Sequence, residues 1–123
     1  MRKILSLSLT PLFLAAAPLA AQTPAAATPQ AQLARVIEDH WAWYLSTHPV
    51  EATARGVRDY DDRISDMSLA ARDAQIAAEK QFVRRLESVP EQGLDATDRV
   101  NRNVLLWMLR DDIDGDRHPA ERH

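Results

Sequence analysis

The chain contains no cysteine among its 123 residues. This absence excludes disulfides, thiol nucleophiles, cysteine-ligated zinc sites and the acylated cysteine of bacterial lipoproteins. Glycine is also rare, with three residues, and no glycine-rich phosphate loop, Gly-x-Ser-x-Gly elbow or Ser-x-x-Lys motif occurs. A domain of this size without disulfides must depend on its apolar core for stability.

The sequence also lacks a basic stripe. Its 15 lysines and arginines are interspersed among 18 acidic residues, which gives a net charge of −3. Binding to a nucleic-acid backbone normally requires clustered cations. We therefore expect no nucleic-acid partner, and interpret the mixed charges as solvated helix faces.

The first 21 residues have the three parts of a secretory signal peptide. Arg2 and Lys3 form a positive start, residues 4–19 are apolar and uncharged, and Ala20 and Ala21 supply the small residues of a cleavage site. Residues 1–21 are thus predicted to be removed during export to the periplasm or the extracellular space. The loss of two cations would change the net charge from −3 to −5.

An uncleaved membrane anchor is the alternative for this segment. A spanning helix needs about 20 apolar residues, and Pro11 and Pro18 interrupt the run. We therefore expect no membrane association after signal cleavage. Residues 1–21 contain no consecutive pair of arginines, which favours the general secretory route over the twin-arginine route.

Residues 22–30 are rich in alanine and proline, which predicts a flexible linker. A first helix is predicted from about Ala31 to Thr47, before Pro49. Six residues at steps of three and four mark its core face: Leu33, Val36, Ile37, Trp41, Tyr44 and Leu45. Trp43 falls on the opposite face and would suit contact with a partner.

A short helical turn is predicted from Val50 to Arg55, with Gly56 as its left-handed cap. Residues 57–67 are polar and irregular. Ser68 stands where an N-cap belongs, ahead of a second long helix predicted from Leu69 to Ser88.

The last predicted helix opens at Asp95 and ends at Gly115 as its C-cap. Residues 104–108 are apolar on nearly every side, so this helix should be surrounded by others. A polar tail, residues 116–123, follows.

Since no strand-like alternation or internal repeat is present, the predicted class is all-α, with three main helices over residues 31–115 in a small antiparallel bundle. Three helices do not supply enough neighbours for such an apolar last helix. The missing neighbours are either the rest of a larger protein or another subunit.

No group of candidate metal ligands has the residue spacing that a known metal-binding motif requires. The four histidines, at 40, 48, 118 and 123, do not form a His-Glu-x-x-His motif. The alternating Asp112, Asp114 and Asp116 suggest a calcium loop, but Arg117 and His123 occupy the positions that require glycine and glutamate. We therefore name no metal ligand here.

Two further groups have a structural and a functional interpretation. Residues 60–63 combine a phenol, two carboxylates and a guanidinium that could bind a substrate. We favour the structural interpretation, in which Asx turns and an Asp–Arg ion pair hold the loop in place. Trp41, Trp43 and Tyr44 could line a pocket, but their spacing favours the core. No catalytic or cofactor-binding residue is therefore predicted.

Four segments in order resemble the amino-terminal region of the bacterial family called domain of unknown function 885. They are residues 41–45 (WAWYL), 49–56 (PVEATARG), 60–68 (YDDRISDMS) and 98–106 (DRVNRNVLL). The resemblance covers about residues 33–115. It implies an exported, large, helical protein grouped with zincin-type metallopeptidases.

The family's zinc-binding His-Glu motif is expected far downstream, so no metal ligand or catalytic residue carries over to this chain. The pattern departs from the family after Gly115. We therefore expect an exported amino-terminal fragment, inactive alone and without a cofactor, zinc being expected only in a full-length member. The alternative is a self-contained periplasmic helical module that binds a partner protein.

Overall fold

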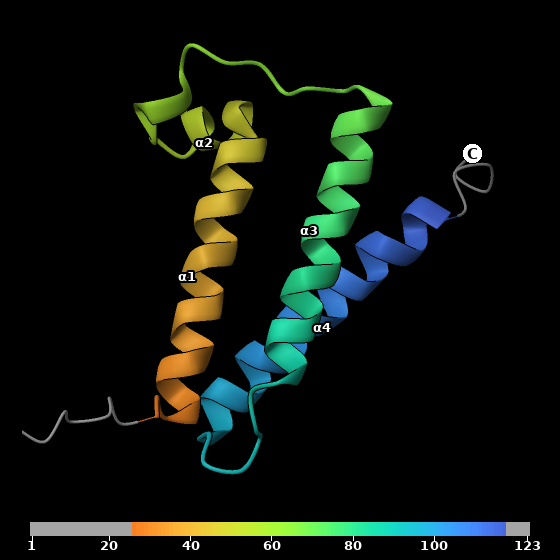
Figure 1. Cartoon of the computed structure of the whole chain (residues 1–123). Helices are drawn as coiled ribbons and strands as arrows, with labels where there is room; N and C mark the ends of the chain where they lie inside the picture. The colour runs from red at the N-terminus through yellow and green to blue at the C-terminus, as the bar shows by residue number, and fades with distance from the viewer. Residues whose placement is uncertain (1–25, 118–123) are drawn as a thin grey trace, which may run out of the picture.

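A computed structural model describes residues 26–117 (Figure 1). The predicted signal peptide, residues 1–21, lies outside the described residues. The same is true of residues 22–25 of the predicted linker and of the tail beyond residue 117.

The described part of the chain is helical and contains no strand, which confirms the all-α prediction. Three long helices, one short helix and one 3-10 helix follow one another: α1 (Pro29–Thr47), α2 (Pro49–Ala54), η1 (Arg58–Tyr60), α3 (Leu69–Glu87) and α4 (Ala96–Arg117). Within residues 26–117 no helix is both long and apolar enough to cross a membrane.

The three long helices form a small antiparallel bundle. Helices α1 and α3 run in opposite directions, and α4 turns back along α3 and then crosses obliquely away from it (Figure 1). The core lies where the three helices meet near the α3–α4 turn. Its buried members are Leu33, Val36, Phe82, Leu86, Val89, Leu94, Leu106 and Leu109.

The local signals place most helix ends correctly. The hydroxyl of Ser68 accepts a hydrogen bond from the backbone N–H of Ala71 at 3.1 Å, which starts α3. Asp95 Oδ1 accepts one from the N–H of Asp98 at 2.8 Å, at the start of α4. Gly56 has a φ of 82° just beyond α2, the left-handed conformation that its predicted cap role requires.

Two predicted boundaries are wrong by two residues. Helix α1 starts at Pro29 rather than Ala31, because Thr28 caps it and proline suits the first helical position. The predicted linker therefore overlaps this helix at its last two residues. Helix α4 continues through Gly115 to Arg117, and Gly115 lacks the positive φ of a C-cap.

Candidate interaction surface

The two tryptophans of α1 have exchanged the environments that the sequence predicts. Trp43 packs against the core, with its ring centroid 5.5 Å from that of Phe82. Trp41 is 45% exposed. The prediction for this pair is wrong because α3 lies against the face of α1 that carries Val36, His40 and Trp43, whereas Trp41 points to the side where α4 diverges.

Trp41 borders a groove between α1 and α4, which we call the α1–α4 groove. One hollow of it has a volume of about 440 Å³ and is lined by Ile37, His40, Trp41, Asn101, Val104, Leu105 and Met108. A second hollow continues it along α1 past Gln30, Leu33, Ala34, Glu38 and Asp98, and shares Ile37 and Trp41 with the first. The two hollows are therefore adjacent, and each has a mostly apolar lining with a few polar groups.

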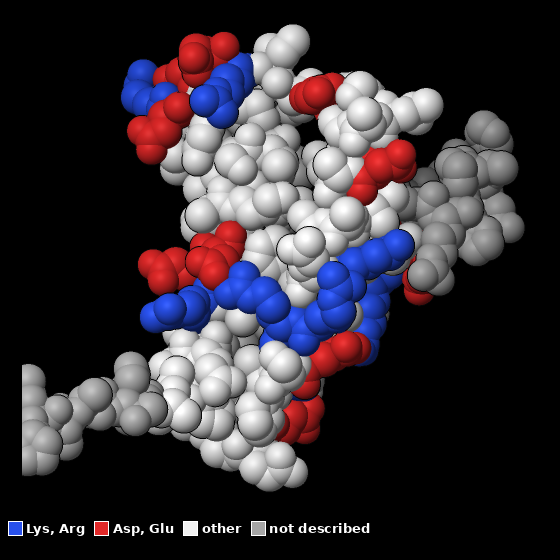
Figure 2. All heavy atoms as spheres, viewed as in Figure 1, with Lys and Arg blue, Asp and Glu red and all other residues white. Residues whose placement is uncertain are grey.

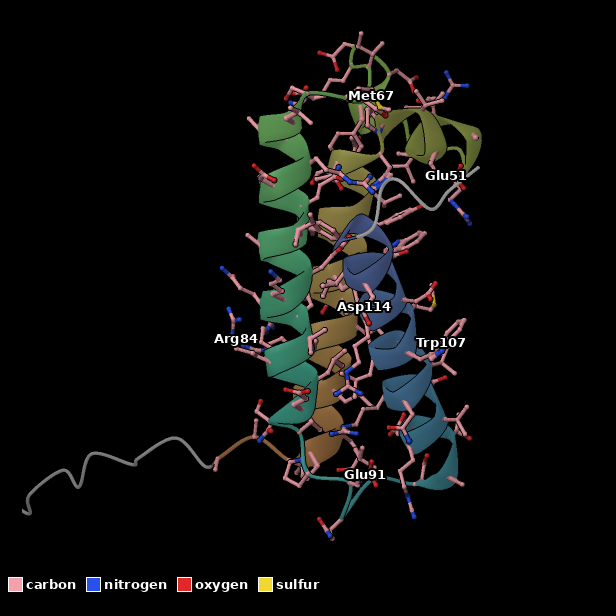
Figure 3. The ribbon with its side chains drawn as sticks, turned by 90° about the vertical axis from the view of Figure 1, so that its right-hand side faces the viewer. Glu51, Met67, Arg84, Glu91, Trp107 and Asp114 are labelled. Carbon is pink, nitrogen blue, oxygen red and sulfur yellow. The ribbon has the colours of Figure 1, made fainter. Side chains whose placement is uncertain are left out.

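Helix α4 adds an exposed apolar ridge beside this groove. Val100, Val104, Trp107 and Met108 are 60%, 50%, 67% and 47% exposed, and Trp107 projects from α4 on the side away from α3 (Figure 3). The described helices therefore do not surround α4, which agrees with the shortage of neighbours expected for a three-helix chain, and that further helices cover it stays a prediction. The described helices bury one side of it only, which carries Arg102, Leu106, Leu109 and Ile113.

Two half-buried titratable groups have shifted pKa values. Glu79 on α3 has a buried Oε2 atom with no hydrogen-bond partner. Desolvation and the nearby negative charge of Asp112 on α4 raise the pKa of Glu79 to about 7, against a smaller opposing effect of Arg72. Burial lowers the pKa of His40, and Asp112 partly offsets that effect.

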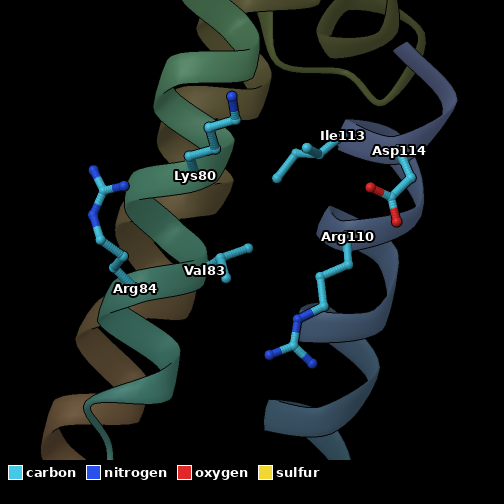
Figure 4. Close-up of a pocket in the computed structure, with 6 residues that line it drawn as sticks. All are labelled: Lys80, Val83, Arg84, Arg110, Ile113 and Asp114. Carbon is cyan, nitrogen blue, oxygen red and sulfur yellow. The ribbon is translucent and has the colours of Figure 1, made fainter. Parts of the chain in front are cut away.

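A second cleft lies between α3 and α4 and is lined by Lys80, Val83, Arg84, Arg110, Ile113 and Asp114 (Figure 4). Its volume is about 320 Å³, and lysine and arginine side chains gather on this face over α3 and α4 (Figure 2). Arg84 points away from the opening in Figure 4, and Arg110 is paired with Glu87 at 2.6 Å. The cations therefore do not converge on one ligand position.

The loop of residues 60–63 does not assemble a binding site. Thr53 Oγ1 donates a hydrogen bond to Asp61 Oδ1 at 2.6 Å, which ties the loop to α2. The guanidinium of Arg63 lies 5.7 Å from the centroid of the Tyr60 ring. Both contacts stabilise the loop itself.

Each of the two described histidines packs against an aromatic ring. His40 has its ring 5.2 Å from that of Phe82, and His48 stacks on Tyr44 at 4.2 Å at the end of α1. His118 and His123 lie outside the described residues. Over residues 26–117 no three histidine or acidic side chains come together in a way that could hold a metal ion.

Sequence reasoning overlooked Arg102, the one buried charged side chain of the described core. Its Nε donates to the carbonyl oxygen of Leu86 at 3.0 Å, and its Nη1 donates to Glu91 Oε1 at 2.9 Å. Arg102 thus joins α4 to the end of α3 and the following turn. Its position four residues before Leu106, on the buried side of the helix, was the available signal.

The fold and this surface define an all-α helical segment with an incompletely covered apolar face. The model of the family described as bacterial protein of unknown function (DUF885) matches residues 49–121, and the chain belongs to this family. The match begins after α1 and covers more than half of the chain. No curated protein and no solved structure matches it.

Proposed function

We propose that this chain serves as the amino-terminal helical segment of an exported, zincin-like hydrolase, and that it packs against further helices without carrying the catalytic groups. The observation that carries this proposal is the open α1–α4 groove with its exposed ridge on α4. Monomeric proteins rarely leave contiguous apolar patches of this kind uncovered unless a partner binds there.

Export and the hydrolase relationship are supported by the sequence. The signal-like composition of residues 1–21 supports secretion. Membership in the family, together with the resemblance of its motifs to a zincin-related group, supports the relationship to metallopeptidases. Zinc would then be held by residues outside the described part of the chain.

The chemistry of the described side chains supports a packing role. Acid–base catalysis needs a positioned pair of groups within hydrogen-bond reach of a substrate. The groove presents one imidazole, His40, whose ring neighbours are Trp43, Tyr44 and Phe82. Its remaining lining is mostly apolar, which favours contact with another protein surface over catalysis.

Zinc titration by calorimetry tests this assignment on the chain purified after secretion, with its N-terminus sequenced. We expect no stoichiometric tight zinc binding, no peptidase activity, and a mature start near Gln22. A tight zinc site or a chain beginning at Met1 would contradict the proposal.

A second measurement distinguishes the segment from a self-contained interaction module. Because the apolar ridge is uncovered, the segment should bind a hydrophobic dye in its folded state. Cooperative thermal unfolding without dye binding would favour the self-contained module instead.

A further inference from the structure

We infer that the α1–α4 groove receives a single amphipathic helix whose apolar ridge is flanked by lysine or arginine, supplied by a partner segment and not by a second copy of this chain. This inference rests on the proposed function, because that helix would be the cover which α4 lacks.

The shape of the groove suits a helix. Ala34, Ile37 and Trp41 form one wall at helical spacing, and Val104 and Met108 form the other. Side chains at these spacings make parallel ridges that interdigitate with those of a third helix. The groove spans about 11 residues of each wall, or about 17 Å, which matches roughly three turns of the incoming helix.

The charge around the groove defines the flanks of that helix. Glu38 and Asp98 line the hollow of the groove near the start of both helices. Asp111 and Asp112 follow the apolar ridge in the sequence of α4. None of these four carboxylates forms an ion pair with a residue of the described chain. By contrast, two acidic residues at contacts between helices are paired, Asp39 with Arg85 and Glu87 with Arg110.

No cation lines either hollow of the groove. Arg55 lies over the Trp41 ring at 5.6 Å, but its guanidinium is paired with Glu51 at 2.7 Å. The rim therefore offers negative charge without a local counterion, and complementary charge on a partner favours association and orients it.

The same rim argues against a second copy as the occupant. If two copies paired through their α4 ridges about a two-fold axis, each would bring the same acidic residues, including Asp111, to the contact. Like charges brought together in this way oppose association. A basic-flanked helix meets the apolar ridge without that repulsion.

Two synthetic peptides test the inference on the secreted chain. Both are helices of about 14 residues with leucines at i, i+3, i+4 and i+7, one flanked by lysines and the other by glutamates. Calorimetry and tryptophan fluorescence should show that the lysine peptide binds about tenfold more tightly than the glutamate peptide at low salt. The preference should shrink as ionic strength rises.

Matched variants locate the binding. The double variant Glu38→Lys, Asp98→Lys should abolish or reverse the preference for the lysine peptide. The control Asp59→Lys, Asp73→Lys makes the same charge change at exposed positions away from the groove and should retain it.

A second pair of variants tests the apolar contact. Val104→Ser should weaken both peptides, and Val50→Ser, at an exposed valine on α2, should weaken neither. Circular dichroism of each variant confirms that it is folded.

Three outcomes overturn the inference. They are equal binding of the two peptides, a lysine preference that survives the groove double variant, and a dimer in sedimentation equilibrium that Val104→Ser dissociates. Any of them leaves the zinc titration unaffected, whereas a tight zinc site would overturn the proposed function and leave the peptide result standing.

Discussion

Replacing Glu79 by glutamine should stabilise the bundle at neutral and alkaline pH and leave it almost unchanged at pH 4.5. The carboxyl has a buried Oε2 without a partner, faces the charge of Asp112, and has a pKa raised from 4.5 to about 7. Glutamine has nearly the same shape and can supply a neutral donor. The variant therefore removes the charge with little change in packing.

The magnitude follows from the shift in pKa. A difference of about 2.5 pH units corresponds to about 3 kcal/mol before screening. Because the Glu79 side chain is partly exposed, solvent reduces the effect, and we expect about 1–2 kcal/mol.

The sign follows from proton binding. Between pH 4.5 and about 7 the folded chain holds more protons than the unfolded chain, so the free energy of unfolding falls as pH rises. The penalty is absent below this window and complete above it.

Urea unfolding followed by circular dichroism, from pH 4.5 to 8.5, measures the difference between Glu79→Gln and the parent chain. His40, whose lowered pKa makes stability rise with pH up to its ordinary value of 6.5, contributes to both chains and largely cancels in this difference. Glu38→Gln, at an exposed carboxylate, is the control and should parallel the parent. If Glu79→Gln also parallels the parent, or is less stable at pH 8, the assignment of Glu79 as a desolvated charge is refuted.

Four other substitutions test the packing and the backbone conformation, and urea unfolding measures each of them. Arg102→Ala should destabilise by about 1–3 kcal/mol, because the Leu86 carbonyl loses one of its donors, the Val89 N–H remaining, and Glu91 loses its partner; a change below about 0.5 kcal/mol would show that the contact is dispensable. Leu86→Ala, at a fully buried position, should cost about 2–5 kcal/mol through the cavity it leaves, and a smaller loss would mean that the core collapses to fill it. Gly56→Ala should cost about 1–2 kcal/mol from its φ of 82° alone, since no atom lies within 4 Å of the added Cβ. Gly93→Ala, whose Cβ would lie 3.4 Å from Pro29 Cγ, should cost at least as much, and the opposite order would contradict this account.

The helix ends were predictable because their causes are local. Ser68 and Asp95 accept hydrogen bonds from backbone N–H groups three residues ahead, and Gly56 takes a conformation that other residues avoid. The start of α1 was missed because the alanine and proline content of residues 22–30 predicts a linker that includes Pro29. At the first position of a helix, proline has no hydrogen bond to lose.

The positions of Trp43, Arg102 and Glu79 were not predictable in the same way. Each depends on which face of its helix meets a neighbour, and sequence periodicity gives the spacing of a face without naming its partner. Trp43 is covered because Phe82 lies opposite it. Glu79 is perturbed because α4 brings Asp112 near it. These contacts join residues far apart in the chain.

Three of the residues that the sequence places in the core and the structure leaves exposed share one location, whereas Trp107 projects from α4 outside it. Trp41 on α1 and Val104 and Met108 on α4 all border the α1–α4 groove. If the sequence had simply predicted the wrong buried face for each helix, the exposed apolar residues of different helices would lie on different sides of the bundle. The inferred partner helix would cover all three residues, and the same apolar pattern would then specify both the bundle and its docking face.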